Sequence, residues 1–285
     1  MNANGFPGCV ESTVTLRDGR IRDCNGFVTA LAVTALRQAG VAAPEQMLDV
    51  LTACRSQTGG FRFWPAGYRP GWAPDLPDDA DDTAIMTLEL LRAGRLTDAE
   101  ARRIACLSIG RHRFGSFGAG PTGWRLPGVF ATWHRQGSAV DLIDCTATAN
   151  VLALYAAVGL WHLSGVEAAV GMLADAIEWA GSGWERAQSL SPFYPEPIEL
   201  VWALEHAVQA GAVPLGPLLA LAARQPWARE RERHLRGRPI CSGPYGAVLW
   251  HSPALSAIRR RGAAKLFQPS RRAEVAEASP AHAGG

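Results

Sequence analysis

Four aspartates lie close together in the stretch Pro77-Asp-Asp-Ala-Asp-Asp-Thr-Ala84. Carboxyl groups crowded in this way cannot all ionise together, so one member of the cluster can stay protonated near neutral pH. The helix predicted to begin here has the opposite effect, because a helix N-terminus favours ionised aspartates. The stretch therefore predicts one carboxylic acid held protonated beside charged neighbours, which is the arrangement of a general acid.

The same stretch also fits the metal-binding pattern Asp-Asp-x-x-Asp through Asp78, Asp79 and Asp82. The pattern resembles that of class I terpene synthases and prenyl diphosphate synthases, which use it to hold Mg²⁺ on a substrate diphosphate. Those enzymes need a second acidic or Asn/Ser/Glu motif on a facing helix, and the sequence offers none that fits. We therefore expect no metal site and keep these three aspartates as the weaker alternative.

Aromatic side chains are candidates for the wall of a binding site, because their π faces attract cations. The chain has 10 tryptophans, and Trp64 and Tyr194 each lie in a Pro-flanked loop before an apolar helix. The residues predicted to bind the substrate are Phe61, Trp64, Trp72, Trp133, Tyr194, Glu196, Trp202 and Trp250. Further candidates for the same wall are Phe63, Trp124, Phe193 and Tyr245.

Four segments of similar length are predicted to position these side chains. Each begins with a polar residue that can cap a helix, continues as an apolar run and reaches a glycine 15 positions later. They are Asn25 to Gly40, Asp79 to Gly94, Asp144 to Gly159 and Glu196 to Gly211. Because Ala, Leu and Val surround most of each helix, we expect inner helices that are buried on two sides.

A second, more amphipathic helix is predicted after each glycine. Pro44 and Glu45 open the first of these partner helices, and Pro214 precedes the last. The capping-box pattern opens the other two, at Thr97 to Glu100 and at Ser164 to Glu167. The segment from Ala247 to Gly262 repeats the helical length once more.

Helical hairpins that recur about every 50 residues predict an all-α fold, either a single-domain α/α toroid or an incomplete barrel of that type. We expect an N-terminal extension over residues 1–22, the toroid over 23–268 and a disordered tail over 269–285. Long loops should gather at the rim of a central cavity. These loops are Gln57 to Pro77, Phe114 to Arg135 and Gly181 to Pro197.

The aspartate stretch resembles the acid motif of the class II terpene cyclases, including the squalene-hopene cyclases, which reads Asp-x-Asp-Asp-Thr-Ala and often follows a proline. The segment Asp79-Ala-Asp-Asp-Thr-Ala84 has that pattern at every fixed position. The turn Gln57-Thr-Gly-Gly-Phe61 and the hairpin repeat are also similar to this superfamily, which includes prenyltransferase-like α/α toroids. The resemblance covers residues 23 to 262.

This resemblance implies an isomerase of isoprenoid biosynthesis that cyclises a linear isoprenoid. Asp81 would be the Brønsted acid that protonates a terminal alkene or epoxide, and Asp79 and Asp82 would support that proton. The acid step needs no cofactor, and Mg²⁺ would help only where the substrate keeps a diphosphate. The family places its motif between two toroidal domains, so a homodimer or a second subunit could close the cavity here.

Two other functions stay open. A non-catalytic toroid could bind a prenyl ligand or scaffold a biosynthetic complex. A Mg²⁺-dependent class I terpene synthase or prenyltransferase would instead use the Asp-Asp-x-x-Asp pattern. The first would keep its ligand affinity after Asp81→Asn, and the second would release diphosphate and lose activity on Mg²⁺ chelation.

Composition narrows the remaining choices. Hydrophobic residues make up 48% of the 285 and charged residues 19%, which suits a folded domain with a large core. The net charge of +2 gives no sign of a nucleic-acid partner. No secretory signal or bilayer-spanning run is visible, so we expect a cytoplasmic protein and leave peripheral membrane contact open. The six cysteines lack a CxxC pair, and we expect them to be reduced packing residues.

Overall fold

The computed structural model describes residues 6–115, 123–134, 142–230, 237–243, 246 and 248–266. Its helices are α1 (Gly26–Gln38), α2 (Glu45–Ala53), α3 (Ala80–Arg92), α4 (Asp98–Ile104), α5 (Cys145–Ala157), α6 (Val166–Ala180), α7 (Trp184–Ser189), α8 (Ile198–Gln209), α9 (Gly216–Ala223) and α11 (Pro253–Leu266). It also contains the π-helical turn η1 (Ala105–Ile109) and the 3-10 turns η2 (Val213–Leu215) and η3 (Pro226–Glu230). Its strands are β1 (Glu11–Leu16), β2 (Gly19–Cys24), β3 (Cys241–Ser242) and β4 (Leu249–His251).

A four-stranded antiparallel sheet contradicts the prediction of an all-α toroid. The strand order is β2-β1-β4-β3, and Val14 of β1 pairs with Ile21 on one side and with Trp250 on the other. The fold is therefore mixed, with helices and an antiparallel sheet. The physical reason for the error is that β3 and β4 have only 2 and 3 residues, too few for an alternating pattern, and that the partner of β4 is the distant strand β1.

The predicted inner helices are observed as α1, α3, α5 and α8. Asn25, Asp79 and Asp144 cap the first three, and their side-chain oxygens accept hydrogen bonds from backbone N–H groups of the first turn. A positive φ between 69° and 105° is found at each predicted terminal glycine, namely Gly40, Gly94, Gly159 and Gly211. Glycine adopts this conformation without a Cβ clash, so it ends the helix at low cost.

The predicted starts of the partner helices had mixed outcomes. Thr97 opens α4 with the expected capping box, in which its side chain and that of Glu100 bond each other's backbone N–H. The capping box predicted at Ser164 is wrong, because Gly165 is the N-cap of α6 and has a left-handed backbone. The helix predicted over Ala247 to Gly262 is wrong in its first part, where β4 precedes α11.

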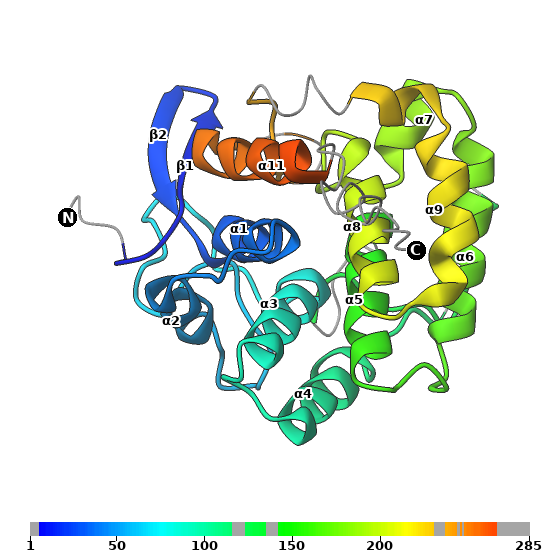
Figure 1. The fold of residues 1–285 in the computed structure, drawn as a ribbon, viewed down its shortest axis with the longest axis horizontal. Helices are drawn as coiled ribbons and strands as arrows, with labels where there is room; N and C mark the ends of the chain where they lie inside the picture. The colour runs from blue at the N-terminus through cyan, green and yellow to red at the C-terminus, as the bar shows by residue number, and fades with distance from the viewer. Residues whose placement is uncertain are drawn as a thin grey trace, which may run out of the picture.

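Helix α1 lies between α11 and α3, and α3, α5 and α8 follow in contact with one another (Figure 1). Arg259 of α11 links that helix to α8, because its two terminal nitrogens donate to the carboxylate oxygens of Glu199 at 2.7 and 2.9 Å. Helices α2, α4, α6 and α9 lie outside this group (Figure 1). The N-termini of α3 and α5 are thereby brought close together.

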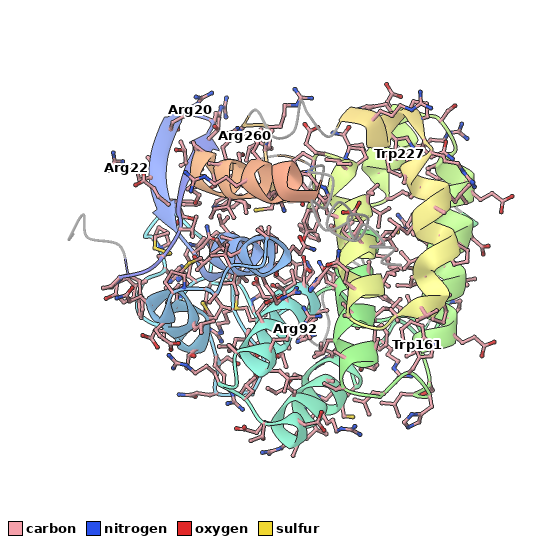
Figure 2. All side chains as sticks on the ribbon, viewed as in Figure 1. Arg20, Arg22, Arg92, Trp161, Trp227 and Arg260 are labelled. Carbon is pink, nitrogen blue, oxygen red and sulfur yellow. A yellow bond between two sulfur atoms is a disulfide. The ribbon has the colours of Figure 1, made fainter. Side chains whose placement is uncertain are left out.

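Two apolar cores meet at α3. Ala84 and Leu88 belong to the core shared with α5, α6 and α8, whereas Ile85 belongs to the core shared with α1, α2 and the sheet. Trp161 and Trp227 pack in or against the first core, on the side of the molecule away from the β1–β2 hairpin (Figure 2). Any site between these two apolar cores is therefore lined mainly by side chains of the second core and of the loops.

The cysteines differ in part from expectation. Cys9 and Cys24 form a disulfide, so the prediction that all six are reduced is wrong for this pair. Cys54, Cys145 and Cys241 are buried free thiols, which suits packing residues.

Some expectations fall on parts of the chain that are not described. The tail predicted over residues 269–285 and the candidate Tyr245 both lie there. Among the helices that are described, none combines the length and the apolar character that crossing a bilayer requires.

Candidate functional site

A cavity of about 480 Å³ lies at the N-terminal ends of α3 and α5, within a single chain. Its volume is in the range of ligand-binding pockets. The three long loops supply much of the wall, with Trp64 and Trp72 from the first, Trp133 from the second and Tyr194 from the third. Strand β4 adds Trp250. The sheet that the sequence analysis did not predict therefore takes part in the site.

Four buried carboxyl groups line this cavity, from Asp79, Asp81 and Asp82 at the start of α3 and from Asp144 at the start of α5. Between 1% and 8% of each of these residues' surface is exposed, whereas a fifth lining aspartate, Asp75, is mostly exposed. No arginine, lysine or histidine lines the cavity among the residues the structure describes. Because the four carboxyls are buried and no cation of the described lining compensates their charges, burial favours their protonated form.

Asp79 and Asp82 form the more strongly protonated part of the cluster. Asp79 accepts a hydrogen bond from the backbone N–H of Asp82 at 2.7 Å, and burial raises the pKa of Asp79 to about 7. Neither side-chain oxygen of Asp82 has a hydrogen-bond partner among the described residues. Burial, followed by the charge of Asp79, raises the pKa of Asp82 well above its usual value. A proton therefore remains on this pair near neutral pH.

Asp81 has different surroundings. Its Oδ1 accepts a hydrogen bond from Asn150 Nδ2 at 2.8 Å, and its Oδ2 accepts one from the Tyr194 hydroxyl. Burial raises the pKa of Asp81 to about 6, and these two donors limit the rise because they stabilise the carboxylate. The NH2 of Asn150 can only donate, whereas the Tyr194 hydroxyl can also accept, so a proton on this acid belongs on Oδ2. Asp81 is thus the carboxyl of the motif whose conjugate base is already stabilised by hydrogen bonds before a proton is lost.

Two loops hold the start of α3 in place. The backbone N–H of Ala80 donates to the Thr132 carbonyl at 2.8 Å, which fixes the loop that carries Trp133. The backbone N–H of Phe61 donates to Thr83 Oγ1 at 3.0 Å, which fixes the preceding loop. These contacts explain why the motif continues as Thr-Ala, since the threonine hydroxyl bonds a neighbouring loop instead of facing the cavity.

Aromatic rings cover the cavity wall in two groups. Phe63, Trp64, Trp72 and Trp250 contact one another with ring centroids 4.7 to 6.2 Å apart. Trp133 and Phe193 form the second group, with centroids 5.4 Å apart. Rings held in mutual contact keep their orientation, so the wall presents fixed π faces to the interior.

Asp23 of β2 anchors the first aromatic group. Its Oδ1 accepts a hydrogen bond from Trp64 Nε1 at 3.1 Å, and its Oδ2 accepts one from Trp250 Nε1 at 2.8 Å. The side chain of Asn25 also donates to Oδ2, at 2.8 Å. One buried carboxylate therefore fixes two tryptophans from distant parts of the chain.

Sequence reasoning missed Asp23 and Asn150 as site residues. Asn150 carried a signal, because it is a polar side chain in the middle of the apolar run of α5 and needed a buried partner. Asp23 carried none, because its partners Trp64 and Trp250 are fixed only by the tertiary structure.

Three predicted substrate-binding residues do not line the cavity. Phe61 is fully buried in the core. The Arg259 guanidinium lies 4.1 Å from the ring centroid of Trp202. Glu196 forms an ion pair with Arg238 at 3.0 Å. The cavity does contain the other predicted residues, namely Trp64, Trp72, Trp133, Tyr194, Trp250, Asp79, Asp81 and Asp82.

The three aspartates of the alternative metal motif, Asp78, Asp79 and Asp82, do not face a common site. Asp78 is directed away from the cavity, where its Oδ2 accepts hydrogen bonds from the Ser56 and Thr58 hydroxyls and its Oδ1 accepts one from Arg62 at 3.2 Å. Asp79 and Asp82 line the cavity instead. Within the described parts of the chain, no group of three or more His, Cys, Asp or Glu side chains is placed to hold a metal ion.

Comparison with known proteins provides no relative for this chain. It matches no protein-family model, no curated protein and no solved structure. The interpretation of the site therefore depends on its own geometry: buried carboxyls with raised pKa values in an aromatic cavity.

Proposed function

We propose that this chain is a proton-initiated, class II terpene cyclase that acts on a linear isoprenoid, with Asp81 as the acid. One observation carries the proposal: the three carboxyls of the Asp-x-Asp-Asp motif line a cavity that eight aromatic side chains of the described chain also line. An alkene is a very weak base, so its protonation requires an acid that is kept from water and aimed at one carbon.

The first step would transfer the proton from Asp81 Oδ2 to a terminal alkene or epoxide. The O–H bond of Asp81 breaks, a bond from that proton to the substrate forms, and a carbocation or an opened epoxide results. Asn150 and Tyr194 then stabilise the Asp81 carboxylate through their hydrogen bonds. This stabilisation makes Asp81 a stronger acid than Asp82, which has no such donors among the described residues.

Asp79 and Asp82 would support the acid without taking part in the bond changes. Their shared proton reduces the negative charge beside Asp81. The aromatic wall would stabilise the carbocations that follow, because π faces attract cations and offer no lone pair for capture. The same wall excludes water, which would otherwise end the reaction early.

Purified protein incubated with linear isoprenoids from farnesyl diphosphate to squalene tests the proposal. We expect cyclic products by mass spectrometry, and in D₂O one deuterium incorporated per product. Asp81→Asn should lower turnover by about 10²–10⁴-fold, the usual contribution of a positioned general acid. Asp78→Asn is the matched control, because that carboxyl is directed away from the cavity.

Two results would contradict the proposal. Tight binding of an isoprenoid without conversion would indicate a binding protein. Release of diphosphate that stops on Mg²⁺ chelation, with Asp81→Asn still active, would indicate metal-dependent chemistry.

A further inference from the structure

Asp144 is a cavity carboxyl that lies outside the acid motif. It caps α5, which packs against α3, and 1% of its surface is exposed. It lines the same cavity as Asp81 and the unpartnered carboxyl of Asp82. The charge of Asp81 acts on Asp144 strongly enough to contribute to its raised pKa. The two carboxyls therefore come from different helices and face the same ligand space.

Backbone N–H groups hold the Asp144 carboxylate in place. Its Oδ1 accepts from Thr146 and Ala147 at 2.9 and 3.0 Å, and its Oδ2 accepts from Phe193 at 3.1 Å. A carboxylate has roughly four acceptor positions, and Oδ2 accepts from one of these backbone groups, so it has room for a proton. Burial raises the pKa of Asp144 to about 7, while the bonds from the Ala147 and Phe193 backbone and from the Ser191 hydroxyl limit the rise. At neutral pH, about half of the Asp144 carboxyls are therefore ionised.

The described lining offers no better proton acceptor. Asp75 is mostly exposed and lies within 3.6 Å of Arg62 and 3.9 Å of Arg69. Cys241 and Tyr194 have pKa values raised well above their usual ranges by burial, so they remain a neutral thiol and a neutral phenol, which are weak bases. Asp144 is the ionisable carboxyl of the cavity that the acid motif does not already use.

We propose that Asp144 is the base that ends the reaction, by removing a proton from the last carbocation. This inference rests on the proposed function. In this step a C–H bond beside the cationic carbon breaks, its electron pair forms a C=C bond, and the proton moves to Asp144 Oδ2. Because Asp81 adds one proton and Asp144 removes one, substrate and product are isomers.

The proton must return to Asp81 before the next turnover. The dipeptide Phe193-Tyr194 contacts both carboxyls, through the Phe193 N–H to Asp144 and the Tyr194 hydroxyl to Asp81. The charges of Asp81 and Asp144 both contribute to the raised pKa of Tyr194. Solvent can carry the proton from Asp144 back to Asp81 when the product leaves.

Asp144→Asn tests this role while preserving the helix cap, since the amide oxygen can accept the bonds from Thr146 and Ala147, and only the Phe193 N–H loses its acceptor. With a substrate that the wild type converts, we expect the variant to start the reaction but to lose the alkene product. Carbocations that are not deprotonated would be captured by water, so the ratio of cyclic alcohol to cyclic alkene should rise at least tenfold. Asp144→Glu, which keeps a carboxylate, should retain the alkene as the main product.

Thermal unfolding of each variant provides the control for folding. An unchanged product ratio and rate in Asp144→Asn, with wild-type conversion intact, would overturn this inference and leave the proposed function standing. No conversion of any isoprenoid by the wild type would overturn both.

A binding measurement adds a readout that does not need turnover. N,N-dimethyldodecylamine is protonated at neutral pH and is a stable substitute for a lipophilic carbocation. Its affinity for the wild type, measured by calorimetry, should fall at least tenfold in Asp144→Asn because a cavity carboxylate is lost. Equal affinity in the two proteins would argue against an anionic Asp144 that faces the ligand.

Discussion

Asp81 and Asp82 are adjacent in sequence, but their carboxyls have opposite surroundings. Asp81 accepts hydrogen bonds from Asn150 and Tyr194, whereas Asp82 is buried without a partner among the described residues. The helical rotation between neighbouring residues produces this difference, because it turns the two side chains toward different neighbours. The Asp81 carboxyl is therefore suited to release a proton, and the Asp82 carboxyl is suited to keep one.

The pH dependence of activity should follow the protonation of Asp81. Its pKa is about 6 and the acid must be protonated to act, so kcat/KM should fall as pH rises through about 6.

Tyr194→Phe removes a donor that lowers the pKa of Asp81. The pH at which kcat/KM falls should therefore rise, by about one unit if the bond contributes roughly 1.5 kcal/mol. A pH profile over pH 5–8 measures both effects, and a limb that does not move would contradict the assignment.

The free energy of unfolding should depend on pH because folding buries the Asp82 carboxyl. In an unfolded chain its carboxyl ionises at the ordinary pKa of 3.8, whereas in the folded chain the pKa is raised well above that. The folded state then binds more protons, so the free energy of unfolding falls as pH rises above 3.8.

Asp82→Asn should remove this penalty. We expect it to stabilise the protein at pH 8 by about 1.4 kcal/mol for each unit by which folding raises the pKa of Asp82, because an amide does not ionise, and to have little effect at pH 4. Calorimetric unfolding at both pH values checks the prediction, and equal changes at the two would contradict it.

At the scale of elements, the β1–β2 hairpin determines the shape of the cavity wall. Asp23 lies in the last part of β2, and its carboxylate bonds one tryptophan from a loop and one from β4. The sheet therefore contributes to the site through a side chain that is not itself in the cavity lining.

Asp23→Ala should loosen this wall. Two indole N–H groups would lose their acceptor, so we expect a loss of about 2–5 kcal/mol of stability and a weaker near-ultraviolet circular dichroism signal from tryptophan. Glu11→Ala on β1 is the matched control, because its ion pair with Arg22 is exposed and should contribute less than about 1 kcal/mol. A similar loss in both variants would indicate a general weakening of the hairpin.

Elements defined by local contacts could be predicted from the sequence, and those defined by distant contacts could not. The caps Asn25, Asp79 and Asp144 bond N–H groups two or three residues away, and the terminal glycines act within one helical turn. The starts and ends of α1, α3 and α5 are therefore encoded by residues close to them in the sequence. The sheet depends on pairing between the two ends of the chain. Asp144 was predicted as a cap, but its position in the cavity depends on how α5 packs against α3.

At the scale of the whole molecule, α11 connects the sheet side to α8. Glu199 is 2% exposed and receives both terminal nitrogens of Arg259, whose guanidinium also lies over Trp202. The Glu199 charge also contributes to the raised pKa of Asp81. This ion pair therefore connects the packing of α11 with the electrostatics of the cavity.

Arg259→Ala should destabilise the fold by about 3–5 kcal/mol, because it breaks a buried ion pair by removing one partner. Replacing both partners, with Glu199→Gln and Arg259→Met, should have a smaller effect. Chemical denaturation of the three proteins measures these changes. Arg261→Ala, at an exposed position on the same helix, should change stability by less than about 0.5 kcal/mol, and a larger change there would weaken the argument.

The pairing of β1 with β4 also sets the order in which the protein can be completed during translation. Asp23 emerges from the ribosome 227 residues before Trp250. Long-range pairing of this kind forms late. A nascent chain therefore cannot add the Trp250 side of the cavity wall until β4 has been made.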